Sequence, residues 1–447
     1  MSTLSSSLHI ARSSLGATQA QLSVTANNIA NADTDGYTAK SARQTANVTN
    51  GTSSGVNVDR VISKVSQYIL SDLLGSTSDT AGALKTFDML KQTQSALGAL
   101  TDKTGDGTSI ANAVLDFENA MTTLAATPES TSLANAAIGA LEDLVNQING
   151  LSEGLQDQIN LANDEVVTGV DTANAIISKI DSLNHRISTL HNAGQSTADL
   201  EDQLNNALVE LSEYMEIKTF KNEDGGTKVY SASGQVMVDS TAHLLSTEEA
   251  PDGTMTISLN GADVTDRLHN GTLGALVTMR DETLPAYMTS LDELATTMKE
   301  ALNLVVPGLV TGSSAADMSV GSSFLSDPAS LLGTSDQETT AYALLDALQG
   351  DLSFDAAGKL GAGDRTLSEY ASELLSFVVN DHTSAGNEMK LAQTELQSIT
   401  DTMNSFYGVN VDEETERLSE LKQLYSLAST LMSVIQEMFD QLLSSVR

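Results

Sequence analysis

The chain has 447 residues, of which 40% are hydrophobic and 4% aromatic, and it contains no tryptophan. This length allows two or three domains with real cores, built chiefly from aliphatic side chains. Its 59 acidic and 22 basic residues give a formal net charge of −37, which argues against nucleic acid or an anionic membrane as a partner. Because the chain has no cysteine, disulfides and thiolate chemistry are excluded.

No targeting or membrane-spanning segment is recognisable in the sequence. Residues 1–16 alternate serines with isolated apolar residues, and they lack the basic region and apolar run of a secretory signal peptide,. No stretch reaches the length of apolar residues that a membrane span needs,. We therefore expect no cleaved signal peptide and no membrane insertion.

The first predicted element is a helix at the N-terminus with an apolar stripe at coiled-coil spacing. The stripe consists of Leu4, Leu8, Ala11, Leu15, Thr18, Leu22, Thr25 and Ile29. A residue about every 3.5 positions keeps one face of a helix turned towards a partner helix, although two threonines weaken this seam. The helix is predicted to end near Asn31, followed by a turn at Asp35-Gly36,. Residues 38–60 are rich in Ser, Thr, Asn and Gly and predict an extended or loop segment.

Helical stripes dominate the next part of the chain. They run through residues 141–155, 176–190 and 200–215, and each is most simply the buried face of a helix in a bundle,. After Met215 the apolar period changes, and short strands with Asp-Gly and Asn-Gly turns predict a β-rich module at about 216–270,.

Helical spacing returns after the β-rich module. It covers residues 273–304 and, after a Gly/Ser-rich stretch at 308–333, residues 367–406, which predict a long helix or a helix pair,. Helices before and after the strands indicate that the β-rich module is inserted into a helical domain built from two distant segments.

The last predicted element is a second coiled-coil helix, at the C-terminus. Its stripe consists of Leu418, Leu421, Tyr425, Ala428, Met432, Ile435, Phe439 and Leu442. Residues 1–45 carry a net charge of +1 and residues 415–447 a net charge of −1, so the whole acidic excess lies between them. Near-neutral ends can pack densely, while an acidic middle stays solvated. We expect the terminal helices to pair with each other or with neighbouring copies of the chain.

The predicted fold class is mainly α with an inserted β-rich module, and with terminal helices that pair as a coiled coil. Residues 1–45 and 405–447 are predicted to form a terminal assembly domain. Residues 46–215 and 271–404 are predicted to form a discontinuous helical domain, and residues 216–270 the inserted module.

No arrangement of residues in the sequence supports catalysis. Residues 51–55 match the nucleophile string GxSxG, but no helix follows them, and we interpret them as a Ser/Gly loop,. Residues 102–107 begin like a calcium loop, but Ala113 stands where the bidentate acid is needed,. The six histidines show no zinc spacing,. We expect a protein that is not an enzyme, with no metal and no cofactor.

Two strings at the inner ends of the terminal helices carry a resemblance to a known family. Residues 26–37 read ANNIANADTDGY, and residues 408–414 read GVNVDEE. Together, in this order and each joined to a coiled-coil helix, they resemble the signatures of the bacterial flagellar axial proteins, the rod, hook and hook-associated family. Asp35 stands where the family often has proline, which leaves the turn to Asp-Gly chemistry.

Within this family the chain looks most like the hook-associated members found at the junction of hook and filament. Residues 199–215 and 271–285 resemble their helices into and out of the β-rich module, and Tyr425 and Ala428 match their last helix. The match is least clear at 300–365, where larger members carry an additional outer domain. We expect that domain to be absent or reduced here.

The resemblance implies a structural protein that assembles as a ring or helical layer between hook and filament. The implied partners are further copies of the chain, the hook protein, the second junction protein and an export chaperone at the C-terminal helix. The implied location is the extracellular flagellum, reached by type III export. Alternatives are another axial component, such as hook or distal rod protein, and a secreted acidic hydrolase or adhesin. The long helical block favours the junction role.

The candidate assembly interface combines the two stripes with the two signature strings. It consists of Leu8, Leu15, Leu22, Asn27, Asn28, Ile29, Asn31, Gly36, Tyr37, Gly408, Asn410, Asp412, Leu421, Tyr425, Ala428, Met432, Ile435 and Phe439. Asparagine amides can bond free backbone carbonyls at a helix end or bridge two subunits without charge. Acids at a helix start are favoured by the helix dipole, so capping alone accounts for Asp412. The sequence leaves open whether the stripes pair within one chain or between chains.

Overall fold

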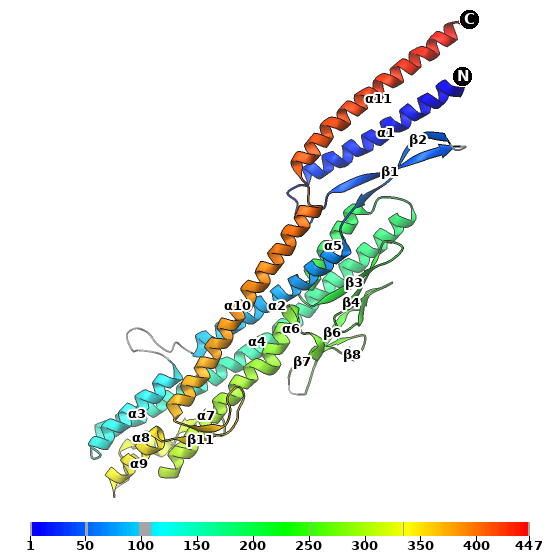
Figure 1. Cartoon of the computed structure of the whole chain (residues 1–447). Coiled ribbons are helices and arrows are strands. Elements are labelled where there is room, and N and C mark those ends of the chain that lie inside the picture. Colours follow the sequence, from blue (N-terminus) through cyan, green and yellow to red (C-terminus); the bar gives the residue numbers. More distant parts are fainter. Residues whose placement is uncertain (1, 50–51, 98–108, 252, 334, 446–447) are drawn as a thin grey trace.

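A computed structural model of the chain describes residues 2–49, 52–97, 109–251, 253–333 and 335–445. The calcium-like string at 102–107 and Gly51 of the GxSxG string lie outside the described residues. The molecule is elongated, with both chain termini at one tip and α8 and α9 towards the other (Figure 1).

Helices make up most of the fold. They are α1 (Ser2–Ala30), α2 (Gln67–Leu97), α3 (Ile110–Ala126), α4 (Thr131–Asn192), α5 (Ala198–Ser212), α6 (Gly271–Thr278), α7 (Leu284–Val305), α8 (Ser322–Ser326), α9 (Gln337–Gln349), α10 (Leu367–Tyr407) and α11 (Val411–Ser445). Two short 3-10 helices cover Thr265–Arg267 and Pro328–Leu332, and a π-helical turn covers Met279–Thr283.

The strands form small antiparallel sheets within the described residues. They are β1 (Lys40–Thr49), β2 (Thr52–Ser63), β3 (Ile217–Lys221), β4 (Thr227–Ser231), β5 (Val236–Val238), β6 (Leu245–Glu249), β7 (Met255–Leu259), β8 (Ala262–Asp263), β9 (Val310–Thr311), β10 (Ser319–Val320), β11 (Leu352–Phe354) and β12 (Gly363–Arg365). The inserted module comprises the sheets β3-β4-β5 and β6-β7-β8, and the other strands pair as β1-β2, β9-β10 and β11-β12.

We call α2 to α10, with the sheets attached to them, the body of the molecule. Helix α4 runs through the body, and its 62 residues contain two of the predicted stripes in one element. The Ser130 side chain caps it by accepting a hydrogen bond from the Leu133 amide, and no proline interrupts it,. Its buried face includes Leu141, Leu144 and Ile148, none of which is exposed to solvent. An apolar stripe of this length needs partners along its whole course, and α3, α5, α6 and α7 supply them,.

Three asparagines of α4 hold the β-rich module against the body. The side chain of Asn163 accepts from the Met255 amide at 2.7 Å. Asn174 brackets Leu245 of β6 by accepting from its amide at 2.8 Å and donating to its carbonyl at 2.9 Å. Asn184 does the same with Thr227 of β4, at 2.9 and 2.7 Å. These bonds pair backbone groups that would otherwise be buried without a partner.

The segment from α6 to α7 is one continuous helix with a π-turn inside it. Pro285 has no amide hydrogen to donate four residues back, and the widened turn at 279–283 accommodates this gap,. Arg280 in the turn is buried and donates to the Met255 carbonyl at 2.7 Å, which ties the helix to the β-rich module.

One continuous hydrophobic core runs from Leu70 on α2 to Ala385 on α10. It includes residues of the body helices and of the β-rich module, but none from α1 or α11 among the described residues. The terminal pair is therefore attached to the body by other means.

The structure confirms the mainly α fold with an inserted β-rich module and packed terminal helices. Residues 217–263 hold six short strands. The predicted Asn-Gly turn joins β7 to β8, with positive φ at Asn260 (54°) and Gly261 (75°), as a two-residue hairpin turn of type I′ requires.

The structure decides between open alternatives at two places, residues 38–60 and 367–406, and corrects other local predictions. Residues 38–60, predicted as an extended or loop segment, contain a long hairpin, β1 paired with β2. Ser53 and Gly55 belong to β2, so the Ser/Gly-loop interpretation of the GxSxG string is wrong; an irregular register with two bulges accommodates its small residues,. The domain boundaries proposed at 45 and 404 fall inside β1 and α10. The segment 367–406 is a single helix, α10.

Candidate assembly site at the terminal helices

Helices α1 and α11 lie side by side and project from one end of the body (Figure 1). The predicted seam of α11 faces α1. Leu421 and Ile435 are 4% and 2% exposed, and Ala428, Met432 and Phe439 are half-buried. Tyr425 lies at the edge of the seam and is 38% exposed. The middle of the predicted seam is thus closed within one chain, whereas Leu442 at its far end is 46% exposed.

On α1 the small residues of the stripe are the buried ones. Ala11, Thr18 and Thr25 recur every seven residues and are 2%, 6% and 2% exposed. Leu8, Leu15, Leu22 and Ile29 of the same stripe are only half-buried. The threonines therefore do not interrupt the seam. Their short side chains permit a close approach, and the Thr18 hydroxyl is satisfied by donating to the Ser14 carbonyl at 2.9 Å,.

The hairpin β1-β2 covers another side of α1, so that α1 lies between the hairpin and α11 (Figure 1). The Val56 amide of β2 donates to the Ser13 hydroxyl at 3.2 Å. Gly55 passes so close to Ser13 that a side chain there would collide with it, and its φ of 127° also suits glycine,.

Asn28 is the polar centre of the joint between α1, β1 and α11, and it is completely buried. Its side-chain nitrogen donates to the Lys40 carbonyl at 2.9 Å and to Glu414 Oε1 at 2.8 Å. Its side-chain oxygen accepts from the Lys40 amide at 3.1 Å and from the Tyr37 hydroxyl at 3.0 Å. All four hydrogen-bonding positions of the amide are used, so this asparagine fixes three elements relative to one another.

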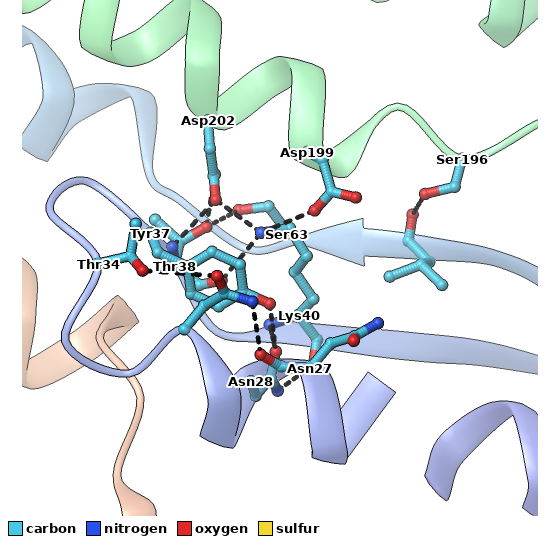
Figure 2. Close-up of polar contacts among 12 residues, drawn as sticks. Asn27, Asn28, Thr34, Tyr37, Thr38, Lys40, Ser63, Ser196, Asp199 and Asp202 are labelled. Atoms are coloured by element: carbon cyan, nitrogen blue, oxygen red, sulfur yellow. Dashed lines mark hydrogen bonds and ion pairs between the residues drawn. The ribbon is translucent and has the colours of Figure 1, made fainter. Parts of the chain in front are cut away.

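A buried ion pair continues the joint into the body (Figure 2). Lys40 and Asp202 of α5 are each 5% exposed, and Lys40 Nζ lies 2.7 Å from Asp202 Oδ2. Asp202 also accepts from the amide and the hydroxyl of Thr38, at 3.0 and 2.7 Å. The exposed Asp199 lies 3.3 Å from Lys40 Nζ, and the Tyr37 ring lies 3.5 Å from it. Every charge in this group has a partner, as burial demands.

The pKa values of Lys40 and Tyr37 reflect this arrangement. Burial acts to lower the pKa of Lys40, but the hydrogen bond and charge of Asp202 outweigh burial and raise it,. The pKa of Tyr37 is raised chiefly by burial, although the Lys40 charge opposes this. At neutral pH Lys40 is therefore an ammonium and Tyr37 a neutral phenol.

The remaining signature residues shape the chain around the joint. Asn31 donates to the Asn27 carbonyl at 2.9 Å and so closes the end of α1. Gly36 has a φ of 71° and faces Asn206, which a side chain would strike. Asn410 accepts from the amides of Asp412 and Glu413, at 3.1 and 3.3 Å, and caps α11,.

The structure does not bring all predicted site residues into one place. Asn28 and Tyr37 meet at the joint, whereas Asn27, Gly36, Asn410 and Asp412 are exposed and Asn31 and Gly408 half-buried. The seam leucines lie further along the helices. Sequence reasoning missed Thr38, Lys40, Asp202 and Glu414. The recurrence of Thr38 and Lys40 at alternate positions beside the signature string was the available signal for a shared strand face.

A second apolar stripe on α11 lies beside the seam and remains exposed, and sequence reasoning missed it too. Leu424 and Leu431 are 52% exposed, Leu427 is 67%, Val434 45% and Met438 40% exposed. Each lies one residue before a seam position, so the stripe repeats with the same coiled-coil spacing,. A helix with two adjacent apolar stripes has surface for a second partner.

The described residues contain no group of three or more potential metal-binding side chains. His185 is exposed and His191 half-buried. None of the helices in the described part of the chain has the length and hydropathy to cross a membrane.

Comparisons with known proteins agree with the architecture. The family model described as "Flagellar hook-associated protein FlgK helical domain" matches residues 90–307, and the model described as "Flagella basal body rod protein" matches residues 8–38. The second match covers α1 and the asparagine signature, whereas the first covers most of the helical body and the β-rich module.

Curated relatives carry the name flagellar hook-associated protein 1. The protein of Escherichia coli K12 is 28% identical over 67% of this chain and 57% of its own length. That of Bacillus subtilis 168 is 30% identical over 52% of this chain and 47% of its own length. The chain thus spans about half the length of the curated relatives it matches. A solved structure of the flagellar hook junction protein FlgK from Burkholderia pseudomallei aligns with a TM-score of 0.47 and 20% identity, over 54% of this chain and 44% of the other.

These matches cover both the terminal signature and the body that the sequence analysis associated with the axial proteins. Over residues 90–307 and 8–38, the chain is similar to flagellar hook-associated proteins of the FlgK type and to flagellar rod proteins.

Proposed function

We propose that this protein is a structural component of the bacterial flagellum that assembles as a ring or helical layer between hook and filament. The proposal extends the name of its relatives, flagellar hook-associated protein 1, to the whole of this chain. It includes an extracellular location, reached by flagellar type III export without cleavage of a signal peptide.

The observation that carries the proposal is the exposed stripe of α11. Five large apolar side chains between Leu424 and Met438 are each 40% or more exposed, although α1 already closes the seam beside them. Apolar surface repeated along a whole helix is a cost in water, and adding subunits removes it. A heterologous contact, in which the stripe of one copy meets a different surface of the next, generates rings or helical layers.

The joint adds a second argument. A layer of identical subunits requires each terminal pair to leave its body at the same angle. The Asn28 amide and the Lys40–Asp202 pair join the two parts through directional contacts, and such contacts define geometry more narrowly than apolar packing does.

The proposed partners are other copies of the chain, the hook protein, the second hook–filament junction protein and an export chaperone. The chaperone is placed at α11, because the exposed stripe between Leu424 and Met438 would need cover before assembly,.

Deletion of the gene followed by electron microscopy of the cells tests the role directly. The expected result is hooks without filaments, with flagellin lost to the medium. Cells with normal filaments would refute the junction role.

A pair of variants tests the stripe itself. In Leu427→Ser/Leu431→Ser the monomer should keep its helical content, since both side chains are exposed, but the variant should fail to restore filaments. The control Leu304→Ser changes a leucine that is 87% exposed on α7 and should restore them. Equal restoration by both variants would contradict the role of the stripe.

The main alternative is that the protein is another axial component, such as hook or distal rod protein. The rod-protein match at residues 8–38 is compatible with it, but the match to a hook-associated helical domain over 90–307 favours the junction role. The sequence contains no arrangement of residues that supports catalysis, which counts against the acidic hydrolase.

A further inference from the structure

The outer face of strands β3 and β4 carries lysine and aromatic side chains, of which Lys218 and Phe220 are exposed and Lys228 and Tyr230 half-buried. Lys218 pairs with Tyr230 across the two strands, and Phe220 pairs with Lys228. Phe220 is 59% exposed and contacts Tyr230 edge-on, with ring centroids 5.6 Å apart. We call Lys218, Phe220, Lys228 and Tyr230 the β3-β4 patch.

The patch points away from the body. The alternate residues of the same strands face inward: Val229 is fully buried, and Lys221 is paired with Glu201 of α5 at 2.8 Å. Since successive side chains of a strand point to opposite faces, Lys218 and Phe220 face solvent.

The charge of the patch is unusual for this protein. The chain has a net charge of −37, yet neither β3 nor β4 contains an acidic residue. Within the described part of the chain, Lys218 and Lys228 have no ion pair, unlike the neighbouring Lys221. Two unpaired ammonium groups around an aromatic pair fit a surface with carboxylates around an apolar side chain.

Helix α10 presents such a surface. Leu391 is 70% exposed, and the exposed Glu388 and Glu395 lie three residues before and four residues after it on the same helix face,. The charge of Glu395 acts on Asp79, whose pKa is raised first by burial and then by the charges of Glu216 and Glu395. We call Glu388, Leu391 and Glu395 the α10 ridge.

The two surfaces also match in spacing. Lys218 and Lys228 are diagonal neighbours, and the Cβ atoms in a pair of this kind are somewhat less than about 7–8 Å apart. Glu388 and Glu395 are seven residues apart on a helix, a rise of about 10 Å. Long lysine and glutamate side chains can span this small difference.

We propose that the β3-β4 patch of one copy docks on the α10 ridge of a neighbouring copy. This inference rests on the proposed self-assembly and specifies a contact between bodies, in addition to any contact between terminal helices. In Figure 1 the sheet and α10 lie on opposite sides of the body, so the contact runs head-to-tail and can continue from copy to copy,.

Cysteine cross-linking of the purified full chain tests this contact, because the chain has no cysteine of its own. After oxidation of the concentrated protein, Phe220→Cys/Leu391→Cys should give a ladder of dimers, trimers and longer products. The matched control Phe220→Cys/Leu304→Cys places the second cysteine at a more exposed leucine. The ladder should be several-fold stronger for the first variant; equal ladders would overturn the inference.

Charge reversal is a second test of the proposed contact. Lys218→Glu/Lys228→Glu, added to the first cysteine variant, should weaken the ladder about tenfold, the effect of losing two exposed ion pairs. Adding Glu388→Lys/Glu395→Lys should restore it, whereas Lys91→Glu/Lys299→Glu should leave it unchanged. A ladder of unchanged strength after both charge reversals would overturn the proposed pairing of the β3-β4 patch with the α10 ridge. If the deletion strain still made filaments, the proposed function would be refuted, but the cross-linking results would not change. The failure of the proposed function and the failure of this inference can therefore be told apart.

Discussion

The body and the terminal pair bury their apolar residues to very different degrees. In the body, core residues such as Leu141, Leu144 and Ile148 on α4 have no exposed surface. In the terminal pair, Leu421 and Ile435 are buried, but a second stripe beside them remains in water. The body completes its core within one chain, whereas the terminal pair leaves apolar surface that only another molecule can cover.

The connection between the body and the terminal pair is polar, whereas both regions are held together by apolar packing. It depends on Asn28, Lys40 and Asp202, which are buried polar or charged residues with defined partners. Loss of an apolar contact mainly weakens a structure, but loss of one partner in a buried polar network leaves the other group unpaired. The following predictions use this contrast, from the largest expected effect to the smallest.

The body should respond to loss of core volume. Leu124→Ala on α3, at a side chain with no exposed surface, should lower the free energy of unfolding by about 3–5 kcal/mol, measured by urea denaturation with circular dichroism. Leu115→Ala on the same helix, at a side chain 42% exposed, is the control and should cost less than about 1 kcal/mol. Similar costs for both would mean that the body core is not closed as described.

The joint should respond to loss of one charge. Asp202→Ala leaves the Lys40 ammonium buried without its main partner and should cost about 3 kcal/mol. The loss should show as faster hydrogen exchange in α1 and the β1-β2 hairpin, with the body unchanged. Asp199→Ala removes a carboxylate that lies 3.3 Å from the same ammonium but is 81% exposed, so it should cost less than about 0.5 kcal/mol. Equal effects would contradict the assigned importance of the buried pair.

Asn28 and Asn27 are neighbours in the sequence, but only Asn28 belongs to the joint. Substituting each in turn distinguishes the joint from the helix surface. Asn28→Ala should cost about 1–3 kcal/mol, because it leaves Glu414 Oε1 and the backbone of Lys40 without their side-chain partner,. Asn27→Ala, at an exposed position, should stay within about 0.5 kcal/mol. Urea denaturation followed by a fluorophore on Asp33→Cys, in the exposed turn, reports on the joint. The comparison fails if Asn27 is the more sensitive position.

Alkaline pH should loosen the joint. The pKa values of Lys40 and Tyr37 are raised above 10.5 and 10.0, so their stabilisation is complete below these values and is lost as the pH rises through the folded-state pKa values. The same fluorophore should therefore report easier unfolding of the joint above about pH 10.

The variant Lys40→Met distinguishes the alkaline unfolding of the joint from the alkaline unfolding of the body. The body should also weaken, because burial raises the pKa of Tyr370 to about 12,. The lysine variant should flatten the pH response of the joint but leave that of the body unchanged. An unaltered response at the joint would show that Lys40 does not carry it.

The sequence was most informative where periodicity is long. The seam of α11 was predicted in the correct register, since a stripe from Leu418 to Leu442 averages over local exceptions,. The sequence left the hairpin β1-β2 open between an extended and a loop segment, because Ser, Thr and Asn are common in loops and the strands are stabilised by packing on α1,. It also failed to show that Thr18 and Thr25 are buried, since the closeness of two helices is a property of the pair.

By itself, the sequence determined the helical body, the inserted β-rich module, the coiled-coil register at both ends and the family signature. These depend on apolar spacing and turn residues, which act over neighbouring positions along the chain. Only the tertiary structure decided that α1 and α11 pair within one chain and that Lys40 and Asp202 meet across 162 residues. It also decided which stripe of α11 stays exposed. Burial and charge pairing depend on which distant segments come together, and no local pattern contains that information.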